Sequence, residues 1–459
     1  MNTPRPLEEG FESEYAKQLI AVDTLLGGDI GQPEGGAHFI ADSYPKDEVQ
    51  LPAVYNDSKA IELRKVGGAQ PGSWETVWNF IHKHGLLDAR DRMVETLGND
   101  VSPLRRKFIE NMGTAFESMT YSALSIAEKR ALPSFDERYR SAAKRDPELV
   151  DTRELLDSLE KELAAVGIST KGKELRDGVK EWEEKIGFVK PENFAAEVER
   201  ISVELMRRTR EQIFAGIDFG FEGYDPHLTD VPFDGMTVKT LNNVHYTGSS
   251  AYEGGLRPNG KPALRDLFEY NTDHPVTHVG LWHLVAHEMK PGHYIDSAIA
   301  DLGWHSGKLG FEAVAHTMST GEVALREGWA QNALAMLHGG SEQAVIDNLG
   351  DEHKIHYIME RLQDAGKQNG AILFQARGLS LEEIKRHFAI ECVLSDAYVE
   401  KMARWANHPI IGPMYGPAYA TGYKVVREAI DKHGAQKVAE AALHQHGYLD
   451  LETFQMVLG

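Results

Sequence analysis

Along most of the chain, apolar residues recur every three to four positions, which is the spacing of an amphipathic α-helix. Before residue 219 this pattern predicts helices at 11–26, 75–96, 103–131, 149–166, 172–186 and 191–215. Pro103 and Pro191 fit the first turns of two of them. Beyond residue 274 it predicts helices almost to the end of the chain, at 275–290, 293–302, 311–338, 341–374, 380–405, 417–433 and 435–446.

The pattern changes in segment 219–274, where Gly, Asp, Asn and Pro accumulate. The β-branched pieces MTVKTL (236–241) and NNVHYTG (242–248) predict two or three short strands, and ALRDLFEYN (263–271) is expected at the edge of a sheet. We therefore expect a mainly α fold with a small β insert. Because no Pro/Ser-rich linker divides the chain, a helical N-terminal half (1–218), the β-containing segment (219–274) and a helical C-terminal half (275–459) should share one core around a central cleft.

Composition narrows the function classes. The 459 residues include 70 acidic and 49 basic side chains, and the net charge of −21 disfavours nucleic acid and anionic membranes as partners. The start, MNTPRPLEEGFESEY, lacks the apolar region of a signal peptide, and no apolar run reaches the length of a membrane span, so a cytoplasmic location is expected. The single cysteine, Cys392, lies in an apolar helical stretch and is expected to be buried without chemistry of its own.

Candidate metal chemistry lies in THVGLWHLVAHEMKPGHYIDSAIA, which contains His287, Glu288 and His293. In the H-E-x-x-H motif of helical metallopeptidases, two imidazoles share one helix face and the Glu beside them serves as general base. Here the second His is six residues after the first instead of four. On an ideal helix, six residues place the second side chain about 240° around the axis from the first, so the two would not share a face. Pro291 and Gly292 lie between them, so we expect a distortion there that brings His293 back.

HEMKPGH followed by REGWA resembles the HExxPGH…EGWA pattern of a bacterial family catalogued as domain of unknown function 885. The segments SSAYEGGLRP, LFEYNTD, LSLEEIKRHF and HPIIGPMYGPAYATGY are also similar to that family, with best coverage over 236–433. The family looks like a distant relative of gluzincin peptidases, with a fold similar to helical carboxypeptidases of the thermostable Taq type. The resemblance implies a Zn²⁺ site with His287, His293 and Glu327 as ligands and Glu288 as the base.

Other site residues follow from the same resemblance. Tyr419 matches the Tyr of a Tyr-x-x-Gly segment and is the preferred oxyanion donor, with Tyr423 as the second candidate. Arg427 lies eight residues beyond Tyr419 on about the same helix face and could bind a substrate carboxylate, which would suit a carboxypeptidase or dipeptidase. Tyr252 and Asn271 lie in the matching loop and strand and are candidate substrate contacts.

Some alternatives stay open at the level of the sequence. His283 and His287 are four residues apart and could form a rival metal pair. Glu322 is the fallback third ligand, and Glu327 could instead form a salt bridge to Arg326 or Arg377. The family commonly has a Tyr and an acidic residue after EGWA, whereas this chain has QNALAML, so a residue that orients a ligand is missing or relocated.

The sequence thus predicts a zinc-dependent metallopeptidase that hydrolyses short peptides by metal-activated water. Its expected partner is a peptide or another small molecule, and a homodimer is left open. The alternatives are a non-catalytic helical binding protein on the same scaffold and a metal-dependent amide or ester hydrolase of a non-peptide substrate.

Overall fold

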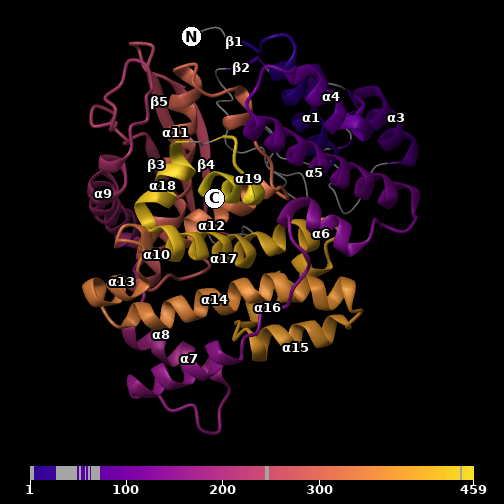
Figure 1. Ribbon diagram of the computed structural model, residues 1–459. Coiled ribbons are helices and arrows are strands. Elements are labelled where there is room, and N and C mark those ends of the chain that lie inside the picture. The colour runs from indigo at the N-terminus through magenta and orange to yellow at the C-terminus, as the bar shows by residue number, and fades with distance from the viewer. Residues whose placement is uncertain are drawn as a thin grey trace.

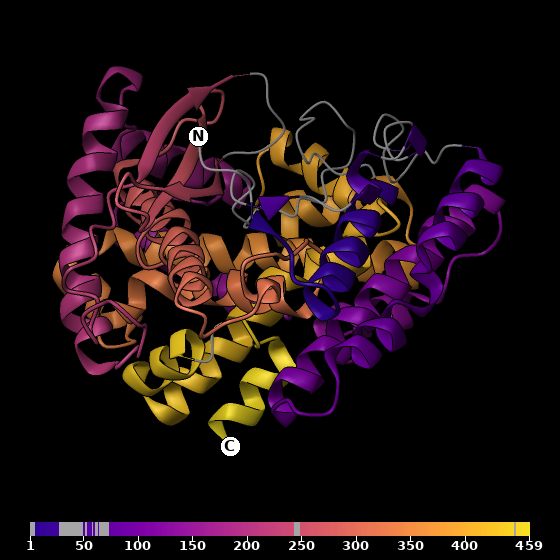
Figure 2. The ribbon, with the colours of Figure 1, turned by 90° about the horizontal axis from the view of Figure 1, so that it is seen from above.

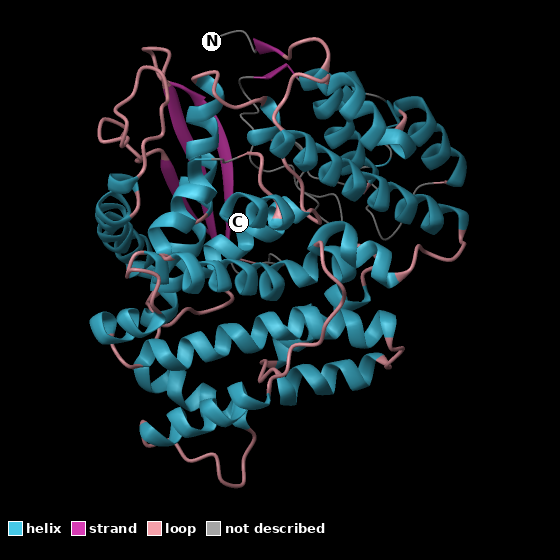
Figure 3. Ribbon diagram, viewed as in Figure 1, coloured by secondary structure: helices cyan, strands magenta, loops and turns pink. Residues whose placement is uncertain are grey.

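The computed structural model describes residues 5–26, 49–50, 53–56, 58–59, 63, 73–242, 248–444 and 447–459. Helices make up most of this part of the chain and strands are confined to one small region, so the expected mainly α fold with a small β insert is confirmed (Figure 3). None of the helices in these ranges is long and apolar enough to cross a membrane. Most of the predicted segment NNVHYTG, and the last two residues of the helix predicted at 435–446, lie outside the described residues.

The N-terminal helices pack around one core, to which Trp304, Phe311 and Met414 of the C-terminal half also contribute. These helices are α1 (Phe11–Leu25), α3 (Trp74–His84), α4 (Ala89–Leu97), α5 (Pro103–Glu128) and α6 (Phe135–Ala143). The single helix expected at 75–96 is two helices, because Gly85 adopts a left-handed conformation (φ 68°) that ends α3. Figures 1 and 2 show these helices on one side of the molecule, with the strands between residues 236 and 271 and α9 (Phe194–Gln212) on the other.

The strands form one three-stranded sheet of β3 (Met236–Leu241), β4 (Gly248–Leu256) and β5 (Pro262–Asn271), besides a two-residue pair of β1 (Arg5–Pro6) and β2 (Val49–Gln50). The prediction that 263–271 lies at the edge of the sheet is wrong. This segment belongs to β5, which lies in the centre, parallel to β3 and antiparallel to β4. Alternate residues of β5 are buried, with Phe268 fully so, since α11 (His293–His305) packs on the sheet.

A lower layer in Figure 1 consists of α7 (Arg153–Ala165), α8 (Leu175–Ile186), α13 (Glu342–Leu349), α14 (Glu352–Ala371), α15 (Leu381–Glu391) and α16 (Asp396–Asn407). Gly350 (φ 129°) divides the helix predicted at 341–374, and residues 392–395 interrupt the one predicted at 380–405. Cys392 is fully buried there, as expected. The α14 helix packs against α17 (Gly416–His433) above it, which joins this layer to the centre of the molecule.

The central helices are α10 (His278–Glu288), α11, α12 (Gly321–Met336), α17, α18 (Ala435–His444) and α19 (Leu451–Leu458). The predicted helix 311–338 begins only at Gly321, because the Thr320 side chain caps α12 by accepting from the Val323 N–H. Its neighbour α17 lies very close. A Cβ built on Gly328 would come within 2.2 Å of the Gly422 carbonyl oxygen, so only glycine permits this approach and it places Glu327 beside α17.

Candidate metal centre

The HEMKPGH segment breaks the helix rather than bending it. The α10 helix ends at Glu288 and α11 begins at His293, with a cis Lys290–Pro291 bond between them. The Gly292 N–H donates to the Ala286 carbonyl at 3.0 Å, which folds the connection back over the end of α10. The distortion expected from Pro291 and Gly292 is therefore present as a break between two helices.

Lack of steric space explains why residue 292 is a glycine. Gly292 has a φ of −70°, which other residues also adopt, but a Cβ on it would come within 1.7 Å of the His287 carbonyl oxygen. The connection is also held from α12, where the buried Trp329 donates its indole N–H to the Pro291 carbonyl at 2.8 Å. Trp329 thus both packs in the core and fixes the segment that carries His293.

This break brings His287, His293 and Glu327 together. Each offers one ligand atom, and the three atoms lie within 4.8 Å of one another. The Glu327 Oε2 atom lies 3.4 Å from His287 Nε2 and 3.7 Å from His293 Nε2, and the two imidazole planes are almost perpendicular at 87°. Ligands about 2.0–2.1 Å from a tetrahedral zinc are separated by about 3.3 Å, so these distances resemble the edges of such a site.

The donor set fits a metal on a second ground. Glu327 is buried, its Oε1 accepts from the Tyr415 hydroxyl at 2.9 Å, and its Oε2 has no hydrogen-bond partner among the described residues. A buried carboxylate oxygen without a partner is costly. The atoms that face Glu327 Oε2 are the two imidazole nitrogens, and a shared divalent cation would satisfy all three at once.

A chain of hydrogen bonds orients the first imidazole. His287 Nδ1 lies 3.2 Å from Gln331 Oε1, and Gln331 Nε2 donates to Asp364 Oδ2 at 2.5 Å. Because an ionised Asp364 accepts only, the amide presents its oxygen to His287, which then carries its proton on Nδ1. When the ring is neutral, the lone pair of Nε2 faces Glu327 and His293, as a metal ligand requires.

The charges at the centre favour a cation. Burial opposes a charge on His287, but the carboxylates of Glu327 and Glu288 raise its pKa to about 9. Burial would raise the pKa of Glu327, yet the facing imidazoles hold it well below its ordinary value. In the absence of a metal, a proton supplies positive charge here, so metal and proton compete for the site.

The two residues expected to act in catalysis adjoin the centre. The Glu288 carboxylate makes no hydrogen bond or ion pair with any residue that the structure describes, and its charge raises the pKa of both His287 and Tyr419. The Tyr419 hydroxyl lies 2.7 Å from that of Tyr415, which donates to Glu327. Burial, with the charges of Glu327 and Glu288, raises the pKa of Tyr419 well above 10, so this hydroxyl stays protonated and can donate.

The predicted substrate contacts are not brought to the centre. Tyr252 is buried and donates to Asp301 on α11, while Asn271 ends β5 and accepts from the Asp273 N–H at 3.0 Å. Tyr423 donates to Glu342 at 3.0 Å. Arg427, the candidate for binding a substrate carboxylate, forms an ion pair with Asp431, 2.7 Å away and one turn further along α17.

The residues of the alternative metal arrangements also have partners outside the centre. His283 Nδ1 lies 3.2 Å from Oε2 of Glu360, a residue of α14. His283 does not belong to the group of potential metal ligands that contains His287. The fallback ligand Glu322 is buried and lies 3.6 Å from His316. Arg326 forms an ion pair with Asp296 at 2.7 Å instead of with Glu327.

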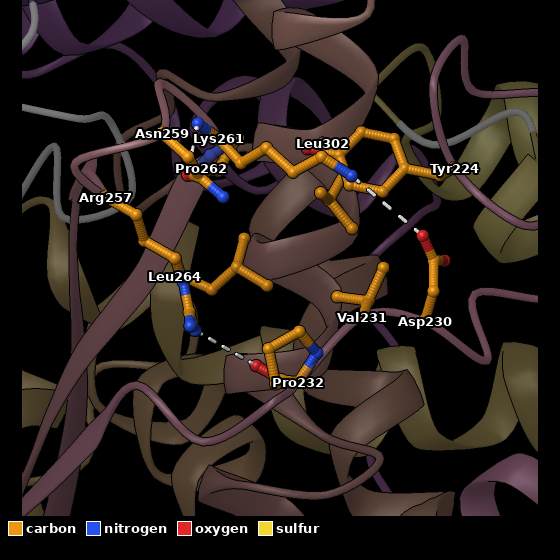
Figure 4. Close-up of a pocket in the computed structure, with 10 residues that line it drawn as sticks. All are labelled: Tyr224, Asp230, Val231, Pro232, Arg257, Asn259, Lys261, Pro262, Leu264 and Leu302. Carbon is orange, nitrogen blue, oxygen red and sulfur yellow. Dashed lines mark hydrogen bonds and ion pairs between the residues drawn. The ribbon is translucent and has the colours of Figure 1, made fainter.

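A cavity lies elsewhere, at the end of the sheet. It has a volume of about 260 Å³ and is lined by residues that include Lys261 and Asp230, whose charged atoms are 4.0 Å apart (Figure 4). Leu302, which also lines it, is nine residues beyond His293 on α11, or about 14 Å along the helix axis. This cavity therefore lies away from the candidate metal centre.

Sequence reasoning missed the residues that support the centre. Tyr415 was within reach of the sequence, because it precedes Tyr419 by one helical turn, and it ends a π-helical turn (Ile411–Tyr415), a feature frequent at functional sites. Gln331 lies in the divergent segment after EGWA, for which the resemblance predicts a missing or relocated partner. Asp364 comes from α14, and no spacing in the sequence indicates its contact.

No family model matches the chain, and no curated protein is similar to it at a significant level. Among solved structures, a putative lipoprotein from Colwellia psychrerythraea has a TM-score of 0.51 and 13% identity, over 85% of this chain and 70% of that one. A putative lipoprotein of unknown function from Shewanella oneidensis has a TM-score of 0.50 and 14% identity, over 88% and 80% of the two chains. At this identity the likeness concerns the fold alone.

Proposed function

We propose that this chain is a metal-dependent hydrolase, and specifically a zinc peptidase that acts on short peptides. The observation that carries the proposal is the buried Glu327 Oε2 atom, which has no hydrogen-bond partner among the described residues. It faces His287 Nε2 and His293 Nε2 at 3.4 and 3.7 Å, beside the unpaired carboxylate of Glu288. Two imidazoles and one carboxylate from the protein are the ligand set of His₂Glu catalytic zinc sites, which leave a position for water.

The residues around the centre have the properties that peptide hydrolysis requires. A zinc ion bound there would polarise the scissile carbonyl and lower the pKa of water. Glu288, without a partner of its own, accepts the proton of the attacking water and passes it to the leaving amine. Tyr419, whose raised pKa keeps it protonated, donates to the oxygen that becomes negative. The Tyr415–Glu327 hydrogen bond holds the third ligand in place.

A cation suited to a substrate carboxylate comes from α14. Lys367 has its Nζ 3.2 Å from the Tyr419 ring centre and 3.1 Å from Asp364, and its side chain is 14% exposed. Arg427 and Lys367 both form ion pairs, but Lys367 lies over the ring of Tyr419 and therefore replaces Arg427 as the candidate that binds a C-terminal carboxylate. A carboxypeptidase or dipeptidase preference is therefore proposed on Lys367.

Two further parts of the sequence interpretation remain proposals. The resemblance to the family of unknown function 885 is supported by the juxtaposition of the HEMKPGH and EGWA residues, but no family model matches. The cytoplasmic location remains a prediction from the sequence.

The proposal is tested by incubating zinc-loaded wild type and the zinc-loaded Glu288→Gln variant with a library of short peptides. The substitution keeps the size of the side chain and removes the base. Wild type should cleave peptides, Glu288→Gln should bind zinc normally and lose turnover, and the control Glu440→Gln on the surface of α18 should match wild type. Full turnover in Glu288→Gln would refute the mechanism. Absence of cleavage by a zinc-loaded wild type that still binds peptides would favour the non-catalytic binding protein, and cleavage only of non-peptide amides or esters would favour the other hydrolase.

A further inference from the structure

A second group of potential ligands lies one helical turn before the first. His283 of α10 meets His356 and Glu360 of α14, and one ligand atom from each lies within 4.8 Å of the others. His283 is buried, whereas the side chains of His356 and Glu360 are 21% and 19% exposed. The mechanism proposed above uses none of these residues.

The carboxylate of Glu360 lies between the two imidazoles. Its Oε2 is 3.2 Å from His283 Nδ1, its Oε1 is 3.5 Å from His356 Nε2, and the ring centres of His283 and His356 are 4.2 Å apart. The longer distance exceeds that of an ordinary hydrogen bond, about 2.7–3.2 Å. Both are close to the separation of about 3.3 Å between neighbouring ligands of a tetrahedral zinc.

An outer partner fixes the ring of His283. His283 Nε2 lies 3.0 Å from Nδ1 of the buried His353. On the other side of the ring, His283 Nδ1 lies 3.2 Å from Glu360 Oε2, so the ring is held at both nitrogens. When a cation takes the place of a proton at Nδ1, the contact of Nε2 with His353 keeps the ring in this orientation.

The charged neighbours leave Glu360 to the two imidazoles. The nearby Arg361 forms an ion pair with Glu342, not with Glu360. Among the described residues, the ion-pair partners of the Glu360 carboxylate are therefore His283 and His356. Imidazole nitrogens and a carboxylate oxygen are ligand types that zinc takes.

We propose that His283, His356 and Glu360 bind a second divalent metal ion of the zinc class, separate from the ion proposed at His287, His293 and Glu327. Two nitrogen ligands and one oxygen ligand suit zinc, and the partly exposed side chains of His356 and Glu360 leave the site open to solvent for entry of the ion and for a water ligand.

This second ion would tie α10 to α14. That link matters to the first centre, because α14 also carries Asp364 and Lys367, the partners of Gln331 and Tyr419. The second ion therefore positions the helix that supports the first centre, without contact with the substrate.

The test is elemental analysis of zinc per chain, after loading with zinc chloride and gel filtration. Four proteins without a His-tag are compared: wild type, His356→Ala, His293→Ala and the double variant, with His433→Ala near the end of α17 as the control. We expect two ions in wild type and in the control, one in each single variant and none in the double variant. Circular dichroism checks that each variant is folded.

Failure of this inference differs from failure of the proposed function. One ion in wild type that persists in His356→Ala and disappears in His293→Ala overturns the second site and leaves the first. One ion that persists in His293→Ala and disappears in His356→Ala supports the second site and refutes the first. As a second readout, added zinc should raise the Tm of His293→Ala but not that of the double variant. An unchanged Tm in His293→Ala would count against the second site.

Discussion

The hydrogen bond from His287 to Gln331 allows a quantitative prediction. Gln331→Met keeps a side chain of similar length but removes both the oxygen that accepts from His287 Nδ1 at 3.2 Å and the amide that donates to Asp364 at 2.5 Å. The ring of His287 then loses the partner that selects its tautomer and orientation. Loss of such partners weakens metal binding about 10–100-fold, which corresponds to about 1.4–2.7 kcal/mol.

The assay is a competition titration of zinc against a chromophoric chelator at constant pH. It is made in the His356→Ala background, so that the proposed second site does not contribute. Gln343→Met is the matched control, because Gln343 also donates to a carboxylate, Asp347, at 2.8 Å, but on the exposed surface of α13. A Kd for Gln331→Met within twofold of the control, in a folded protein, would refute the role of Gln331.

Three more predictions follow from single contacts. Lys367→Met should lower kcat/KM about tenfold for peptides with a free C-terminal carboxylate and leave amidated peptides unaffected; equal losses for both would exclude carboxylate recognition. Gly328→Ala should cost about 1–3 kcal/mol in urea unfolding, because its Cβ would meet the backbone of Gly422 at 2.2 Å, and wild-type stability would contradict that close approach. His408 accepts hydrogen bonds from two backbone N–H groups through Nδ1, and burial lowers the pKa of His408 to about 4. As the pH falls, this imidazole is therefore protonated in the unfolded chain before it is protonated in the folded one. The free energy of unfolding should decrease as the pH drops from about 6.5 to 4. His408→Asn should reduce that slope by up to about 1.4 kcal/mol per pH unit in urea unfolding at several pH values, and an unchanged slope would contradict the assignment.

Local signals account for the part of the fold that could be predicted. Helical periodicity and capping are properties of neighbouring residues, so the helical class and many of the helices follow from them. The central place of β5 did not, because its parallel pairing with β3 joins segments separated by a whole strand and depends on packing against α11. The predicted start of α12 is ten residues early. The apolar periodicity continues through the short turn Phe311–Ala313, and it does not show that the helix begins only after the cap at Thr320.

The candidate site divides in the same way. The grouping of His287 and His293 could be predicted because Pro291 and Gly292 mark the break between them, and Glu327 came from the resemblance of EGWA. The contacts from α14 could not, because His356 lies 73 residues beyond His283 and no periodic pattern connects the two helices. Side chains that support a site from another helix are fixed by tertiary packing, which a single sequence does not display.

Zinc-edge anomalous diffraction from a zinc-soaked crystal tests the central claim most directly. The account predicts an anomalous peak about 2.0–2.2 Å from His287 Nε2, His293 Nε2 and Glu327 Oε2. Absence of that peak at saturating zinc, or a peak bound by His283 and His287 together, would contradict it.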